Sequence, residues 1–316
     1  MMRQGLLFLA LASFWLQAVA GPNSTQQRPI RIITNNWTSQ IVLAHITGEL
    51  FKQQGYPVKY VSSSTAQQWG ALAHGAAHVQ VEVWEGTMSE KFNDMAQRGL
   101  IVDAGTHDAT TREDWWYPKY VEPLCPGLPD WQALKKCAAI FSTQGNQTGT
   151  YYAGPWEKPD EARVRALALN FDIVLLKESD DLWRVLSKAY DEKRPIVLFN
   201  WTPNWVESRY EGQFVEFPAY APECETQPEW GVNKNLVYDC GNPANGWLKK
   251  AAWPGMKNQW PCAYQLLEKI NFSNQQLANA SALVVLKKMS HLQAAQHWLK
   301  ENKNIWSPWL PQGCQP

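Results

Sequence analysis

The chain has 316 residues, of which 29 are basic, 29 are acidic and 18 are tryptophan, so its formal net charge is zero. Balanced charge argues against a nucleic-acid or anionic-membrane partner, because both require a concentrated basic surface. The basic pairs Lys249-Lys250 and Lys287-Lys288 are therefore interpreted as solvated faces. A chain of this length exceeds a single typical core, which predicts two lobes.

The N-terminus has the pattern of a secretory signal peptide over residues 1–20. Arg3 supplies the positive end, residues 6–16 the apolar stretch, and Ala18-Val19-Ala20 a small-residue cleavage site. The apolar stretch is short for a membrane span, which needs about 20 apolar residues. Because no cysteine directly follows the signal, we expect an exported, freely soluble protein without a lipid anchor.

Strand and helix patterns alternate in the first part of the mature chain. Apolar or alternating runs predict strands at residues 29–34, 58–61 and 78–84. Helical patterns lie between them, one from Thr38 or Ser39 to Gly55 and one over residues 67–74. This order predicts a β-α-β-α-β unit with parallel crossovers.

A second region begins near His107 and has its own α/β elements. We expect a short element at residues 115–117, strands at 149–153, 173–176 and 195–200, and helices at 131–137, 160–170 and 181–190. After about residue 220 the pattern turns irregular, and it ends in helical segments at 264–270, 273–278, 281–289 and 292–302. Two α/β lobes follow, with the chain crossing between them more than once.

All six cysteines lie after the signal: Cys125, Cys137, Cys224, Cys240, Cys262 and Cys314. An even count in an exported protein favours disulfides. Several pairings are open, and nearness along the chain favours Cys125–Cys137 and Cys224–Cys240, which leaves Cys262 with Cys314. Metal binding is the weaker alternative, because the chain has no Cys-x-x-Cys motif.

Four tryptophans stand at strand ends or helix starts. Trp84 and Trp201 end predicted strands, and Trp37 and Trp156 precede predicted helices. Open α/β sheets bind ligands at the carboxyl ends of their strands. The face of an indole attracts a cation, so these rings predict a cage for a quaternary ammonium group. The alternative is that they are ordinary core residues, as most large aromatics are.

Several segments resemble the substrate-binding proteins of glycine betaine/choline-type ABC importers for quaternary amines. They are Trp201-Thr202-Pro203-Asn204-Trp205, Val83-Trp84, Gly154-Pro155-Trp156 and the C-terminal Trp298-Leu299, Asn302 and Trp309. The likeness extends over roughly residues 30–309. It implies an α/β, two-lobed periplasmic binding protein fold of type II-like architecture, with the ligand in the interlobe cleft. We expect lobe 1 to comprise residues 28–106 plus 216–316, and lobe 2 residues 107–215.

The resemblance also implies a function. The protein is expected to be a monomeric periplasmic solute receptor that binds glycine betaine, choline, carnitine or a related methylated amine. It would deliver this ligand to an ABC permease in the inner membrane, without catalysis, cofactor or metal. Carried over residue by residue, the cage is Trp84, Trp156 and Trp201. Trp37, Tyr117 and Glu85 complete the predicted ligand-binding set.

The polar end of the ligand also needs partners. Free backbone N–H groups at helix starts near Thr38-Ser39 and Trp156-Glu157 are candidate donors, and His107 is a candidate to assist them. The acidic residues Glu82 and Glu85 adjoin the cage, which departs from the family pattern. A ligand that presents a hydroxyl or an N-oxide tolerates a glutamate better than a betaine carboxylate does.

A secreted carbohydrate-binding protein or glycan-active enzyme is the alternative function, because tryptophan platforms also stack on sugars. Glu82 and Glu85 would then be its paired carboxylates. Residues three apart on a strand point to opposite faces, so this pair does not converge without a turn. The sequence contains no Gly-x-Ser-x-Gly, His-Glu-x-x-His or phosphate-loop motif.

Overall fold

The computed structural model describes residues 28–314. The predicted signal peptide at residues 1–20 lies outside this range. Within the described residues, no helix combines the length and the apolar character that crossing a membrane requires.

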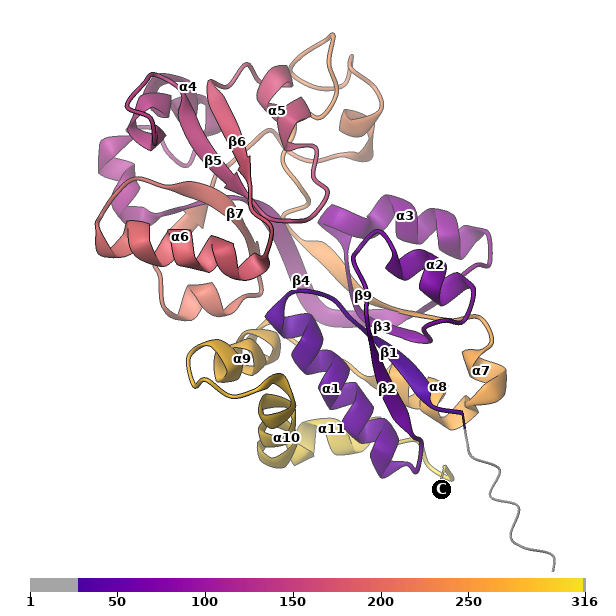
Figure 1. Ribbon diagram of the computed structural model, residues 1–316. Helices are drawn as coiled ribbons and strands as arrows, with labels where there is room; N and C mark the ends of the chain where they lie inside the picture. Colours follow the sequence, from indigo (N-terminus) through magenta and orange to yellow (C-terminus); the bar gives the residue numbers. More distant parts are fainter. Residues whose placement is uncertain (1–27, 315–316) are drawn as a thin grey trace, which may run out of the picture.

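Nine strands are hydrogen-bonded in the order β2-β1-β3-β9-β4-β7-β5-β6, and β8 pairs with β4 (Figure 1). The strands are β1 (Ile30–Thr34), β2 (Val58–Ser62), β3 (Val79–Trp84), β4 (Val102–Pro118), β5 (Gly149–Ala153), β6 (Phe171–Leu175), β7 (Val197–Thr202), β8 (Gly212–Phe214) and β9 (Gly246–Ala252). β1 pairs in parallel with both β2 and β3, which confirms the predicted crossovers.

The strands form two lobes (Figure 1). The first lobe contains β1, β2, β3 and β9, and the second contains β5, β6, β7 and β8. The helices are α1 (Thr38–Gln53), α2 (Gln68–Ala73), α3 (Glu85–Gln97), α4 (Leu134–Cys137), α5 (Asp160–Ala166), α6 (Ser179–Asp191), α7 (Met256–Gln259), α8 (Pro261–Lys269), α9 (Asn274–Val285), α10 (His291–Glu301) and α11 (Lys303–Trp306). One helix, α9, replaces the two that were predicted there, and its start is closed by a capping box on Ser273.

β4 belongs to both lobes. Its residues up to Thr111 pair with β9, and those from Arg112 to Trp116 pair with β7. The chain returns to the first lobe between β8 and β9, so it crosses twice, as expected. Sheet pairing changes partner between Thr111 and Arg112, close to the predicted first boundary. The exact lobe limits at residues 107 and 216 stay a prediction.

Three disulfides cross-link the described residues, two of them between cysteines that are close in the sequence. They join Cys125 to Cys137, Cys224 to Cys240 and Cys262 to Cys314, which confirms the pairing favoured by nearness along the chain. The last bond ties the C-terminal segment to α8. The described residues contain no free cysteine.

The expectation of a solvated face at Lys249-Lys250 is wrong for Lys250. Neighbouring residues of a strand point to opposite faces. Lys249 therefore reaches Asp103 at 2.7 Å on the outside, while Lys250 is fully buried. The Lys250 ammonium donates to the carbonyl oxygens of Glu268 and Ile270, and burial lowers its pKa to about 8.

Candidate ligand-binding site

A cavity with an empty volume of about 270 Å³ lies between the two lobes. The side chains that line it are Trp37, Trp84, Thr87, Met88, Glu113, Trp156, Phe199 and Trp201. All four tryptophans predicted from strand ends and helix starts are therefore brought together. We call Trp37, Trp84, Trp156, Phe199 and Trp201 the aromatic cage.

Trp156 is the central ring of the cage. It meets Trp37 edge to face at a centroid distance of 6.2 Å and an interplanar angle of 82°. It meets Trp201 in the same way at 5.1 Å and 86°, and Phe199 at 5.5 Å. Edge-to-face contacts are favourable because the positive edge of one ring meets the negative face of the next. The rings thus hold one another in place.

Local structure explains how the first lobe presents its two tryptophans. Trp37 and Trp84 are the N-cap residues of α1 and α3, and both have extended backbone angles. An N-cap lies outside the helix, where its side chain is free to turn away from the helix axis. The first turns of both helices also carry backbone N–H groups without intrahelical partners. Two positive helix ends therefore begin beside the cage.

Glu82 lies behind two of the rings. Its Oε2 atom accepts hydrogen bonds from the indole N–H groups of Trp37 at 2.7 Å and Trp84 at 3.0 Å, and from the Ser39 hydroxyl at 3.0 Å. The side chain is fully buried, and Oε1 has no partner among the described residues. Burial raises the pKa of Glu82 to about 7, against the opposing effect of the three hydrogen bonds.

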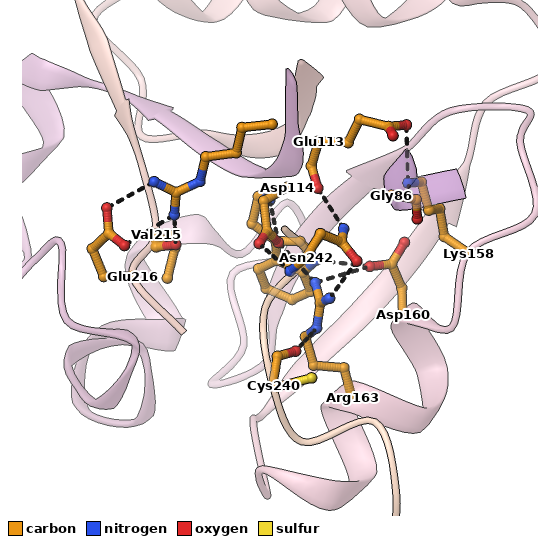
Figure 2. Close-up of polar contacts among 12 residues, drawn as sticks. Gly86, Glu113, Asp114, Lys158, Asp160, Arg163, Val215, Glu216, Cys240 and Asn242 are labelled. Carbon is orange, nitrogen blue, oxygen red and sulfur yellow. Dashed lines mark hydrogen bonds and ion pairs between the residues drawn. The ribbon is translucent and has the colours of Figure 1, made fainter. Parts of the chain in front are cut away.

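Glu113 forms part of the cavity wall, a position that sequence reasoning missed. It lies directly opposite Trp201 in the β4–β7 pair, so both side chains project to the same face. Oε1 accepts from the Thr87 hydroxyl and from the Lys158 ammonium at 3.1 Å, while Oε2 is buried without a partner in residues 28–314. Lys158 also donates to the Gly86 carbonyl oxygen at 3.3 Å (Figure 2). The lysine thus joins the second lobe to the start of α3.

A family model described as the substrate binding domain of ABC-type glycine betaine transport systems matches residues 28–301. The chain belongs to this family.

Relatives and solved structures agree with this assignment. The chain is 37% identical over 292 residues to the trimethylamine N-oxide-binding protein of Pelagibacter ubique strain HTCC1062, covering 89% of this chain and 90% of the relative. Lactococcal OpuAC in its closed conformation with glycine betaine has a TM-score of 0.70 and 18% identity, covering 90% of this chain and all of that one. A choline-binding protein of an ABC transporter, in complex with choline, has a TM-score of 0.71 and 15% identity, covering 89% and 91%.

These findings confirm the two-lobed α/β periplasmic binding protein fold. Members of the family are substrate-binding proteins of ABC importers for quaternary amines, and they act outside the cytoplasm. The protein is accordingly a solute receptor and not an enzyme. The glycan-active alternative finds no support. Among residues 28–314, no group of three or more His, Cys, Asp or Glu side chains is arranged to hold a metal ion.

Three other residues considered for the site of this receptor lie away from the cavity. The hydroxyl of the buried Tyr117 donates to the Glu122 carboxylate at 3.4 Å. The Glu85 carboxylate accepts from the backbone N–H of Trp247 at 2.9 Å. His107 is buried, and burial lowers its pKa to about 3. Its Nδ1 accepts from the backbone N–H of Phe272, so Nε2 carries the proton and donates to the Val81 carbonyl oxygen at 3.0 Å. None of the three lines the cavity.

The receptor's lobes also touch beside the cage. The Trp156 indole N–H donates to the Asn36 side-chain oxygen at 3.1 Å, and the Ser179 hydroxyl donates to the Asn36 carbonyl oxygen at 2.6 Å. Asn36 belongs to the first lobe, and the other two residues belong to the second. We call these three residues the latch. The latch fixes the central ring of the cage to the opposite lobe.

Proposed function

We propose that the receptor binds a small methylated amine without a carboxylate, trimethylamine N-oxide in first place, and delivers it to an ABC permease in the inner membrane. The ligand-binding residues are Trp37, Trp84, Trp156, Phe199, Trp201 and Glu113. Tyr117 and Glu85 are left out of this set, because their side chains are engaged elsewhere.

The charge of the cavity wall is the main support for this choice. Glu113 is the charged side chain that lines the cavity, and its Oε2 atom lacks a partner in the described part of the chain. The nearby Lys158 ammonium is already paired with Glu113. Because Lys158 already bonds Oε1 of Glu113, it is not free to pair with a ligand carboxylate, and such a carboxylate would lie beside the unpartnered Oε2 atom, which is unfavourable at a buried site. A trimethylammonium group would instead contact the faces of the cage indoles and the Glu113 carboxylate.

Size and relatives support the same ligand. The cavity is small, and the relative with 37% identity is named for trimethylamine N-oxide. The oxygen of an N-oxide carries a partial negative charge and needs hydrogen-bond donors. The first turn of α3 reaches the cavity at Thr87, so its backbone N–H groups are suitable donors.

We further propose that the receptor is exported to the periplasm by a signal peptide at residues 1–20 and works there as a monomer without a lipid anchor. Three disulfides fit an oxidising compartment. Lobes at residues 28–106 plus 216–316 and at 107–215 would close around the ligand by a hinge motion.

The decisive experiment is a titration of the purified receptor with trimethylamine N-oxide, choline, glycine betaine and carnitine, followed by tryptophan fluorescence and calorimetry. We expect saturable binding, tightest for trimethylamine N-oxide. Trp156→Ala removes the central ring and should weaken binding by about 2 kcal/mol, roughly 30-fold. Trp230→Ala is the matched control, because this indole is exposed and outside the cage. Tighter binding of glycine betaine than of trimethylamine N-oxide would overturn the ligand assignment. No detectable binding of any of the four ligands would overturn the methylated-amine function.

A further inference from the structure

Glu82 has an unusual position for a carboxylate in a binding protein. It is fully buried and does not line the cavity, yet one of its oxygen atoms bonds the N–H groups of two cage rings. The two rings come from different elements, the start of α1 and the end of β3. Glu82 and Trp84 are two residues apart on one strand, so their side chains share a face. The carboxylate is therefore shielded from the ligand by the rings that it holds.

No charged side chain in the described fold neutralises this carboxylate. Its three partners, Trp37, Trp84 and Ser39, are all neutral. On the neighbouring strands and on α3, Glu85 bonds Trp247, Glu113 bonds Lys158, His107 bonds Val81, Lys249 bonds Asp103, and Lys250 bonds Glu268 and Ile270. On α1, Lys52 pairs with Glu49, and burial lowers the pKa of His45, which favours its uncharged form. A buried charge without a counter-charge is costly unless something positive approaches it. In a cation-binding receptor, that partner is the ligand.

The indole rings transmit the charge to the cavity. Hydrogen bonds to an ionised acceptor are about twice as strong as neutral ones, and they polarise the donor. An indole whose N–H faces a carboxylate becomes richer in electrons on its faces, which strengthens its attraction for a cation. The direct Coulomb attraction also persists across a ring in a dry site, where screening is weak. Both effects act only on a ligand that carries positive charge.

We propose that Glu82 is a specificity-determining residue that acts through Trp37 and Trp84, and that its buried negative charge makes the cage select a fixed positive charge over an uncharged group of the same shape. This inference deepens the proposed function and rests on it.

The pH dependence of binding follows from the same geometry. Burial raises the pKa of Glu82 to about 7 in the free receptor. A bound cation favours the ionised carboxylate and lowers this pKa in the complex. Affinity for a cation should therefore be constant above about pH 7 and should fall as the pH drops below it.

Glu82→Gln isolates the charge. Because Oε1 has no partner in residues 28–314, an amide NH₂ group can take its place while the amide oxygen still accepts from both indoles. The probe is tetramethylammonium, measured by calorimetry at about pH 8, because it carries only the charge that all candidate ligands share. We expect at least a tenfold loss of affinity, and loss of the pH dependence between about pH 6 and pH 8. Ser39→Ala is the matched control: it removes the third donor and should keep the pH dependence.

An uncharged ligand separates charge from ring placement. tert-Butanol has the shape of trimethylamine N-oxide without its charges, and its weak binding can be followed by NMR titration. If the charge of Glu82 is the cause, Glu82→Gln should change tert-butanol affinity less than twofold. An equal loss for tert-butanol and tetramethylammonium would show that Glu82 only holds the rings, and would overturn the inference.

The parent protein provides a test that needs no variant. A flat affinity for tetramethylammonium between about pH 6 and pH 8, or no binding of this cation, would overturn the inference. Binding of tetramethylammonium without binding of trimethylamine N-oxide would overturn the ligand assignment alone, because the charge selection would still be present.

Discussion

Two carboxylates adjoin the aromatic cage, and they differ in the side chains that surround them. Glu82 is enclosed by neutral donors behind the rings, whereas Glu113 lies in the cavity wall and shares its charge with Lys158. Glu82 therefore contacts the rings, whereas Glu113 faces the cavity. Each role leads to a measurable effect.

Glu82→Gln should stabilise the ligand-free protein at neutral and alkaline pH. The folded-state pKa of this acid is raised to about 7 from an ordinary value of 4.5. An acid with a raised folded-state pKa favours folding below its unfolded pKa, and that contribution is lost as the pH rises from about 4.5 to 7. We expect the variant to gain roughly 3 kcal/mol at about pH 8. Urea unfolding at pH 5 and pH 8 checks this, and an equal effect at both pH values would contradict it.

Glu113→Gln should reduce the selectivity of the site against ligands that carry a carboxylate. The amide removes the negative charge in the wall but keeps its size, so a ligand carboxylate is no longer repelled. We expect glycine betaine to gain affinity relative to trimethylamine N-oxide by about tenfold, near 1.4 kcal/mol. Calorimetry with both ligands measures this ratio. The control is Glu223→Gln, an acid between β8 and β9 that does not line the cavity. An unchanged ratio in Glu113→Gln would show that Glu113 does not determine ligand specificity.

The tryptophans of the site were predictable and Glu113 was not. Trp37, Trp84, Trp156 and Trp201 each follow a strand pattern or precede a helix pattern, and such positions face the ligand cleft in α/β folds. Glu113 lies in the run Thr-Arg-Glu-Asp, where charged neighbours resemble an ordinary solvated segment. Its burial results from pairing with β7, which is far away in the sequence.

At the scale of elements, α5 fixes the second lobe to the shared strand. Arg163 of α5 donates to Asp114 of β4 at 2.8 Å and to the Cys240 carbonyl oxygen at 2.9 Å (Figure 2). Asp114 also accepts from the backbone N–H of Asn242 at 3.0 Å. Arg163 and Asp114 are almost completely buried. The loop that follows the Cys224–Cys240 disulfide is thereby attached to β4 beside the cage.

Arg163→Met should destabilise the protein strongly. Removing one partner of a buried ion pair leaves an uncompensated charge, at a cost of about 3–5 kcal/mol. Arg165→Met is the matched control on the same helix, because Arg165 is exposed and lies 3.7 Å from the exposed Glu161. It should cost less than about 1 kcal/mol. Urea unfolding of both variants gives the comparison, and similar losses would contradict the role assigned to the buried pair.

The sequence predicted elements with strong periodicity and missed α3, β9 and the part of β4 before residue 115, all of which contain many polar residues. The strands at β1, β3 and β7 and the helix α6 have clear patterns and were found. The polar sequence of α3 hides its buried face of Met88, Phe92 and Met95. β9 carries Lys249-Lys250, which suggests solvent, and all residues of β4 from Thr106 to Asp114 are polar except Ala109. Tertiary pairing, which local patterns do not contain, determines these strands.

At the scale of the molecule, the latch joins the cage to both lobes. Trp156 lines the cavity and donates its N–H to Asn36 of the opposite lobe. If the cage holds the ligand as proposed, we expect lobe closure to form both contacts and ligand release to occur at a rate set partly by the latch.

Asn36→Ala should speed ligand release without weakening the ligand-free protein. The substitution removes the side-chain acceptor of Trp156 but keeps the backbone oxygen that Ser179 contacts. A hydrogen bond of this kind contributes about 1 kcal/mol, so dissociation should accelerate roughly fivefold. Stopped-flow fluorescence measures this rate. Trp156→Phe, which loses the same bond, should show no further acceleration when combined with Asn36→Ala, and an additive effect would contradict the latch.

β4 also determines how cooperatively the protein unfolds. Two separate cores would ordinarily melt in separate steps. Here one continuous strand supplies ladder hydrogen bonds to both sheets, pairing with β9 up to Thr111 and with β7 from Arg112. Fraying of either sheet exposes the backbone of the other, so the two cores should lose structure as one cooperative unit. Calorimetry should record a single transition whose calorimetric and van't Hoff enthalpies agree. Because β4 joins the two lobes, we expect heat to unfold both of them in the same transition.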